Sequence, residues 1–181
     1  PWPPAPPPLA GCRPPAGCGL AYALSGPRPW WLLAVTAGLV LNWLGDSLDG
    51  TLARHRRHER PRFGFYVDHL VDAFGALFLV GGLAVSGLMT PLVGALLLVA
   101  YFLLGIQTYL AAYAIGRFKI SWGGLGGTEL RILLAALNVL VMFRPRVALA
   151  GSSWLLFDVV GAVAAAALVV VSVGAGIRGP L

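Results

Sequence analysis

The sequence predicts an all-α, polytopic transmembrane helical bundle with five clear spans and a partial or damaged first helix. Apolar residues make up 58% of the 181 residues and charged residues only 11%, whereas soluble domains carry about 25% charged residues. The mean hydropathy is +0.81. A soluble globular domain and a disordered chain are therefore excluded. Helices are expected because a membrane offers backbone polar groups no partner outside the segment itself.

The first segment, residues 1–18, is Pro-rich and irregular, with eight prolines among its first fifteen residues. Proline lacks a backbone donor and breaks helices, so this segment is not expected to cross a membrane. Residues 19–25 (GLAYALS) look like the last two turns of a helix whose earlier half is missing. Two explanations stay open, a truncated or scrambled start and a genuine Pro-rich extension. The membrane domain is expected over residues 19–181.

The five clear spans follow from uncharged stretches. Residues 29–45 carry no charge and give the first span. The 44 uncharged residues between Asp72 and Arg117 suffice for two helices of about 20 residues each, with a turn expected at residues 86–91. Residues 128–143 give a short fourth span and residues 154–174 a fifth. Asp158 lies inside the fifth span without an evident partner; it could bond Asn138 on another helix or face an interface, and no role is assigned to it.

The net charge of +6 comes from thirteen basic and seven acidic residues. In a soluble protein this excess would raise the question of nucleic acid, but the positive-inside rule explains it better here, and no nucleic-acid partner is expected. Nine basic residues lie in loop 54–62, near residues 117–119 or at positions 131 and 178, which places these segments in the cytoplasm. The opposite side receives the remaining four: Arg13, Arg28, Arg144 and Arg146.

Four of the seven acids fall within 27 residues: Asp46, Asp49, Asp68 and Asp72. Acids three or four positions apart share one helix face, and the short connection predicts antiparallel helices that bring both pairs to one membrane level. Ionisable groups at this depth are costly and functional by default. Four facing carboxylates repel unless cations neutralise them, and all-oxygen ligand sets select hard divalent ions. The pattern therefore predicts a two-metal site for ions such as magnesium, manganese or calcium, and magnesium or manganese is the expected cofactor.

The residues around these acids suit phosphate chemistry. Gly50 and Gly64 permit close backbone approach, and the guanidinium of Arg54, one turn after Gly50, can pair with a phosphate. Two divalent ions, a carboxylate cluster and an arginine are the components that phosphoryl transfer uses. The sequence therefore predicts a membrane enzyme whose site opens at the cytoplasmic boundary.

The segment from Asp46 to Asp72 contains DxxDGxxAR, nine further residues and then GxxxDxxxD. These eight fixed positions resemble the signature of the CDP-alcohol phosphotransferase (CDP-alcohol phosphatidyltransferase) family, and GGLGGTELRI looks like a bacterial branch of it. The resemblance implies a six-helix membrane fold, a homodimer and a role in phospholipid biosynthesis. In that reaction an acceptor hydroxyl attacks the phosphorus next to the lipid alcohol of a CDP-linked lipid, and CMP leaves.

The resemblance also implies a role for each matching position. Asp46, Asp49 and Asp68 would be metal ligands, and Asp72 either a ligand or the catalytic base that takes the acceptor proton. Small residues would leave room for the cytidine, and Arg54 would touch the diphosphate. The positions assigned to the CDP pocket are Gly50, Ala53, Arg54 and Gly64.

The Gly-rich loop of residues 116–128 has two interpretations. It is either a flexible turn followed by a helix cap, or an anion site in which backbone N–H groups act with Arg117, Lys119 and Arg131 on an acceptor phosphate. Two further alternatives concern the whole chain, an ion- or proton-coupled transporter that uses the clustered aspartates and an inactive membrane scaffold. The clustering of acids at one boundary and the complete motif favour the transferase. The donor would be CDP-diacylglycerol or another CDP-alcohol, and the small alcohol acceptor is left open.

Overall fold

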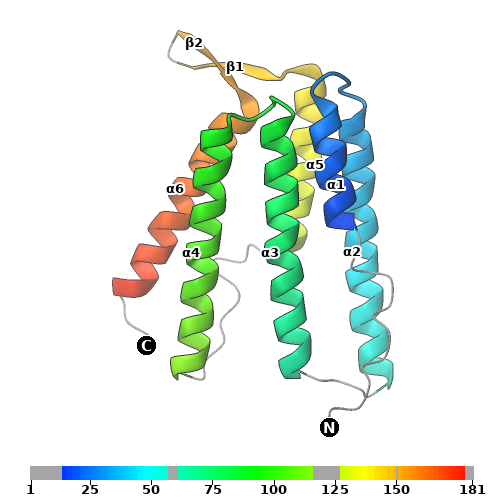
Figure 1. The fold of residues 1–181 in the computed structure, drawn as a ribbon, viewed down its shortest axis with the longest axis vertical. Helices are drawn as coiled ribbons and strands as arrows, with labels where there is room; N and C mark the ends of the chain where they lie inside the picture. Colours follow the sequence, from blue (N-terminus) through cyan, green and yellow to red (C-terminus); the bar gives the residue numbers. More distant parts are fainter. Residues whose placement is uncertain (1–13, 57–60, 116–126, 150, 178–181) are drawn as a thin grey trace.

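The computed structural model describes residues 14–56, 61–115, 127–149 and 151–177. Within these ranges, side chains are described except at 14–15, 46–56, 61–68, 111–112, 114–115, 127–129 and 175–177. Over the described part the helices run lengthwise through one bundle, and α1 covers only the upper part of it (Figure 1). The predicted all-α architecture with a short first helix is confirmed. The helices are α1 (Pro14–Ser25), α2 (Trp31–Arg56), α3 (Pro61–Val85), α4 (Pro91–Ile115), α5 (Gly127–Phe143) and α6 (Leu156–Ile177).

Helix α1 begins at Pro14, five residues before the start that the sequence predicts. Prolines are tolerated in a first turn, where the backbone N–H groups have no helical partner in any case. The helix packs against both α2 and α3. Its contact with α3 is made by backbone, because a Cβ added to Gly82 would overlap the carbonyl oxygen of Gly19. Helix α1 is therefore a tightly fitted part of the bundle.

The turn between α3 and α4 lies where the uncharged stretch predicts it. Helix α3 ends at Val85 and α4 begins at Pro91, and between them Gly87 has a φ of 78°, a conformation that favours glycine. The carbonyl oxygen of Thr90 accepts the first helical bond of α4 from the N–H of Gly94, at 3.1 Å. Thr90 is thus the N-cap, followed by a proline at the first helical position.

A short β-hairpin joins α5 to α6 and was not predicted from the sequence. Strands β1 (Arg146–Leu149) and β2 (Ser152–Leu155) pair antiparallel, with Leu149 opposite Ser152. Gly151, between the strands, has a φ of 80°. The last helix therefore begins at Leu156, two residues after the predicted start of the fifth span.

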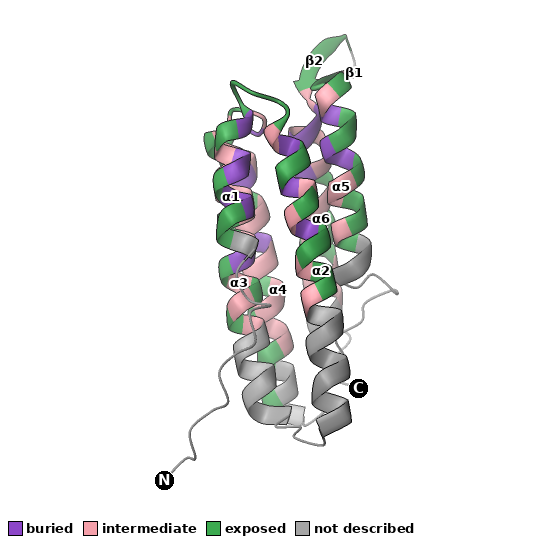
Figure 2. Ribbon diagram, turned by 90° about the vertical axis from the view of Figure 1, so that its right-hand side faces the viewer, coloured by how far each residue is buried: buried purple, intermediate pink, exposed green. Residues whose placement is uncertain are grey.

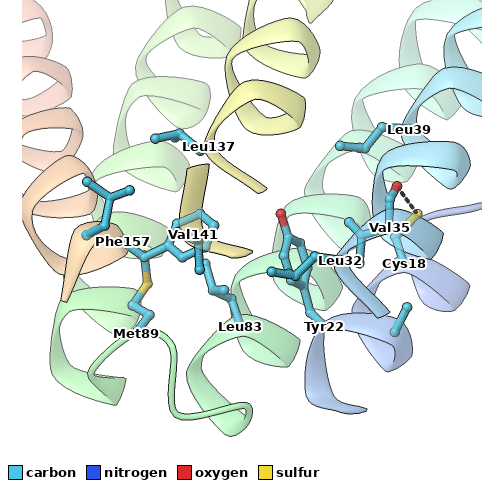
Figure 3. Packing of buried hydrophobic residues seen from close by; sticks show 12 residues of the cluster. Cys18, Tyr22, Leu32, Val35, Leu39, Leu83, Met89, Leu137, Val141 and Phe157 are labelled. Atoms are coloured by element: carbon cyan, nitrogen blue, oxygen red, sulfur yellow. Dashed lines mark hydrogen bonds between the residues drawn. The ribbon is translucent and has the colours of Figure 1, made fainter. Parts of the chain in front are cut away.

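The buried apolar residues gather at the end of the bundle that carries the hairpin (Figure 2). The cluster lies where α1 ends and α2 begins, next to the α3–α4 turn, and it reaches Val141 of α5 and Phe157 of α6. Tyr22 is 1% exposed and its ring meets that of Phe157 edge to face, with the centroids 6.2 Å apart. Figure 3 shows Tyr22, Leu32 and Leu83 side by side in this core.

A buried chain of hydrogen bonds links three helices through this core. The Tyr22 hydroxyl donates to Oδ1 of Asn138 at 2.8 Å, and Nδ2 of Asn138 donates to the Thr36 hydroxyl at 3.2 Å. Asp158 bonds elsewhere: its carboxylate accepts from the backbone N–H and the hydroxyl of Thr90, both at 2.6 Å. Of the two alternatives left open for Asp158, the bond to Asn138 is not formed, because Asp158 lies in the first turn of α6, beside the start of α4.

Two described stretches are long and apolar enough to cross a membrane, Pro91–Leu110 and Leu156–Gly174. Their large apolar side chains are mostly outward-facing, as with Leu92 (67% exposed) and Val170 (70% exposed). Such contiguous apolar surface suits lipid better than water. The other helices contain shorter apolar stretches: Ala16–Ser25, Trp31–Gly45, His69–Val85 and Leu130–Phe143. Two of the five predicted spans are thus long and apolar enough by themselves to cross a membrane.

Candidate functional site

The motif residues on α2 fall on one face of a continuous helix. The helix extends without a break from Trp31 to Arg56. Asp46, Gly50 and Arg54 follow one another at intervals of four residues, and so do Asp49 and Ala53. The motif therefore forms two adjacent rows along the helix.

The motif residues on α3 show the same regularity. Gly64, Asp68 and Asp72 are four residues apart within the helix that starts at Pro61, so they follow one another along its surface. Helices α2 and α3 run in opposite directions, and the end of α2 and the start of α3 lie at the same end of the bundle (Figure 1). The predicted antiparallel direction is confirmed for the backbone. The predicted direct packing is not, since over the described residues α2 and α3 are not among the closely packed helix pairs and each packs against α1.

The two pairs of aspartates stand at matching depths. Asp49 is seven residues before the end of α2, and Asp68 is seven residues after the start of α3, which corresponds to about 10 Å of helix in each case. Asp46 and Asp72 are ten and eleven residues from the same ends, or about 15 Å. Asp49 therefore lies at about the same depth in the bundle as Asp68, and Asp46 at about the same depth as Asp72.

Of the four motif aspartates, the structure describes the side chain of Asp72 alone, and this side chain is exposed. Among the residues with described side chains, no three His, Cys, Asp or Glu residues gather in a group that could hold a metal ion. Asp46, Asp49 and Asp68 lie outside that set. The similar depths of these acids on the two helices and their oxygen donors are compatible with a divalent cation.

Helix α4 contributes an aromatic side chain, Tyr109, that sequence reasoning missed. The Tyr109 ring meets the His69 ring of α3 edge to face, with the centroids 5.0 Å apart, and α3 packs against α4. A signal was available, because Tyr109 is one of the polar groups, with Tyr101, Gln107 and Thr108, in a mostly apolar span. Gln107 contacts α6: its Nε2 donates to the Ser172 carbonyl of that helix at 2.9 Å.

The predicted acceptor-binding residues are only partly described. Arg131 lies in the second turn of α5, and α5 packs against α2, the helix that carries the first half of the motif. Arg117 and Lys119 lie outside the described residues. Three of the four basic residues assigned to the opposite side share one end, since Arg28 precedes α2 while Arg144 and Arg146 follow α5, and all three are exposed. The fourth, Arg13, lies outside the described residues.

Comparison with known proteins identifies the family. The family model described as CDP-alcohol phosphatidyltransferase matches residues 16–174, which include all six helices over most of their length and the whole motif. Neither the curated proteins nor the solved structures contain a match to the chain. The family comprises membrane-associated transferases of phospholipid biosynthesis that generally depend on divalent metals. No observation supports the transporter alternative. With a match that covers most of its length, the chain belongs to the CDP-alcohol phosphatidyltransferase family.

Proposed function

We propose that this protein transfers a phosphatidyl group from CDP-diacylglycerol to the hydroxyl of a small alcohol and releases CMP. The observation that supports the proposal most strongly is the matching depth of the two aspartate pairs on antiparallel α2 and α3, inside the region that the family model covers. The lipid donor is favoured over a smaller CDP-alcohol because the outward faces of α4 and α6 are apolar, which suits a bundle surrounded by lipid.

In the proposed reaction the acceptor oxygen bonds to the phosphorus next to the lipid alcohol. The bond from that phosphorus to the oxygen of CMP breaks, and CMP leaves with the electron pair. Asp72 takes the proton of the acceptor hydroxyl. Arg54 pairs with the diphosphate, while Gly50, Ala53 and Gly64 leave room for the CDP group. Bound magnesium or manganese would neutralise the diphosphate and the leaving oxygen.

The ligands proposed for two such ions are Asp46, Asp49 and Asp68, with Asp72 as a shared ligand or as the base. A carboxylate that keeps one oxygen away from the cation retains an acceptor site for a proton or a hydrogen bond. Arg131, which lies on the helix next to α2, is proposed to pair with an anionic group of the acceptor, together with Arg117 and Lys119. An acceptor that carries a phosphate suits three cations best.

The proposed topology places the motif at the cytoplasmic side of the cell membrane, with the five long helices α2 to α6 as spans. It is supported by the segregation of Arg28, Arg144 and Arg146 to the opposite end and by the greater number of basic residues near the motif. A homodimer is the assembly expected from the resemblance.

The test is CMP release from CDP-diacylglycerol by membranes that contain this chain, with glycerol phosphate, inositol phosphate and serine as acceptors, with and without magnesium. We expect magnesium-dependent release with one of them. Asp49→Asn should abolish it, because an amide cannot replace the charge of a carboxylate ligand. Ser153→Ala, an exposed position on β2 at the far end, is the control. Undiminished turnover in Asp49→Asn would remove the metal-ligand assignment.

A further inference from the structure

Asn42 is a polar side chain in the apolar stretch Trp31–Gly45 of α2. The carboxamide side chains of the protein are Asn42, Gln107 and Asn138, and the latter two both bond to neighbouring helices. Among the residues that the structure describes, none forms a hydrogen bond with the Asn42 amide. A carboxamide inside an apolar span is costly without a partner. The hydrogen bonds of the fold therefore do not account for an amide at this position.

Asn42 lies on the inward side of α2, one turn closer to the motif than the contact with α1. That contact is made at Gly38, where an added Cβ would overlap the Cys18 sulfur of α1. At about 100° per residue, Asn42 is rotated by about 40° from Gly38, and its side chain is partly buried. Large apolar side chains cover the opposite side of α2 and are exposed: Leu33, Val40 and Leu44. Asn42 therefore faces the bundle rather than the lipid.

The row of α2 that contains Asn42 continues into the motif. Asn42, Asp46, Gly50 and Arg54 follow one another at intervals of four residues, which makes each a neighbour of the next along the helix. Asn42 is one turn, or about 6 Å, from Asp46, on the side away from the end of α2. Gly50 and Arg54 lie on the other side of Asp46, toward that end. The polar row thus extends one turn beyond the acids into the apolar span.

A lipid nucleotide has its chemical groups in the same order. In the proposed function the CDP group lies at the level of Gly50, Arg54 and the aspartates, so the acyl chains extend toward the membrane interior. The glycerol esters lie between the lipid phosphate and the acyl chains, a few bonds from the phosphorus that reacts. Ester carbonyl oxygens accept hydrogen bonds, and the NH2 group of a carboxamide supplies two donors. Asn42 therefore lies at the level expected for the ester carbonyls of the donor.

We propose that Asn42 binds the diacylglycerol part of the donor, with Nδ2 donating to an ester carbonyl oxygen of CDP-diacylglycerol. This inference rests on the proposed function. Asn42 takes no part in the transfer of the phosphatidyl group, and its effect is on which donor is bound. It favours an acylated donor over a CDP-alcohol without esters, because the amide stays unpaired when no ester carbonyl is present.

The test measures CMP release with two donors, CDP-diacylglycerol and its dialkyl ether analogue, in which CH2 replaces each ester carbonyl. The variants are Asn42→Leu and the smaller Asn42→Ala, assayed with magnesium and whichever acceptor of the panel supports turnover by the wild-type protein. We expect the wild type to prefer the ester donor about tenfold in kcat/KM. Both variants should lose about tenfold with the ester donor and stay within about twofold of the wild type with the ether donor. The KM for the acceptor should not change.

Gln107→Leu is the matched control, because it removes a carboxamide that is bonded to α6. It should lower the thermal midpoint and keep the preference for the ester donor. Asn42→Leu should unfold at the same temperature as the wild type or at a higher one, because leucine suits an apolar span better than an unpaired amide.

Three results would overturn this proposal alone: equal losses with both donors in the Asn42 variants, a wild-type protein without preference for the ester donor, or a loss of preference in Gln107→Leu equal to that in Asn42→Leu. A lower thermal midpoint in both Asn42 variants would also overturn it, since the amide would then have a structural role. Absence of CMP release by the wild-type protein with either donor would overturn the proposed function as well.

Discussion

The Tyr22 hydroxyl donates to Oδ1 of Asn138 at 2.8 Å, across 116 residues of sequence, and both side chains are almost completely buried. The bond joins α1 to α5, and Asn138 extends it to Thr36 of α2. The half-length first helix is therefore tied to the bundle by a specific polar contact besides its apolar packing.

Removing this hydroxyl should weaken the bundle measurably. In Tyr22→Phe the ring packing is kept but Oδ1 of Asn138 loses its donor. Leaving a buried acceptor unpaired costs about 1–3 kcal/mol, although hydrogen bonds between membrane helices average only about 0.6 kcal/mol. We expect a loss of about 1–2 kcal/mol in unfolding experiments in detergent. Tyr113→Phe, at an exposed position, is the control, and equal stability of the two variants would contradict the prediction.

The glycine contact between α1 and α3 gives a second prediction. A Cβ at position 82 would overlap the carbonyl oxygen of Gly19, whereas a Cβ at the neighbouring position 81 would meet nothing within 4 Å. Gly82→Ala should therefore displace α1 and destabilise the protein by more than about 2 kcal/mol, at the upper end of overpacking effects. Gly81→Ala should be neutral or slightly stabilising, because alanine favours helix over glycine.

The two alanine variants are best compared by thermal unfolding and by the yield of folded protein in the membrane. They have the same composition and differ by one position on one helix. If Gly82→Ala unfolded at the same temperature as Gly81→Ala, the backbone contact between α1 and α3 would be shown to have no energetic importance.

Much of the fold follows from local sequence signals. Uncharged stretches located the helices, and the Ser86–Pro91 segment marked the α3–α4 turn because its glycine and proline serve special backbone conformations there. The hairpin at 146–155 was missed because the sequence marks residues 144–153 only as a connection between two apolar stretches, and so short a segment with Arg146, Gly151 and two serines carries no clear period that separates paired strands from a loop.

For the candidate site too, local sequence patterns predicted some features and missed others. The helical spacing of the motif and the resemblance identified Asp72 from sequence, but not the contact between the rings of His69 and Tyr109. That contact joins residues 40 positions apart and depends on how α3 and α4 pack, which no local pattern encodes. The pairing of Asp158 with Thr90, 68 residues apart, was unpredictable for the same reason.

A third prediction concerns this Asp158–Thr90 pair. The carboxylate accepts two hydrogen bonds from Thr90, the N-cap of α4, and thereby joins the start of α6 to the start of α4. Thr90→Val and Asp158→Asn should each cost about 1 kcal/mol, the usual size of a lost cap. In a double-mutant cycle the two losses should be non-additive by about 0.5–1 kcal/mol. Strictly additive losses would show that the two residues act independently.

The last prediction concerns the orientation of the bundle in the membrane. Basic residues are more numerous near the motif end, which the positive-inside rule assigns to the cytoplasm. In a cysteine-free background (Cys12→Ser, Cys18→Ala), Ser152→Cys on the exposed hairpin should react with a membrane-impermeant maleimide in intact cells. His58→Cys, between α2 and α3, should react only after the cells are permeabilised. The reverse pattern would place the motif outside the cell, where cytoplasmic CDP-alcohols are absent, and would contradict both the topology and the proposed reaction.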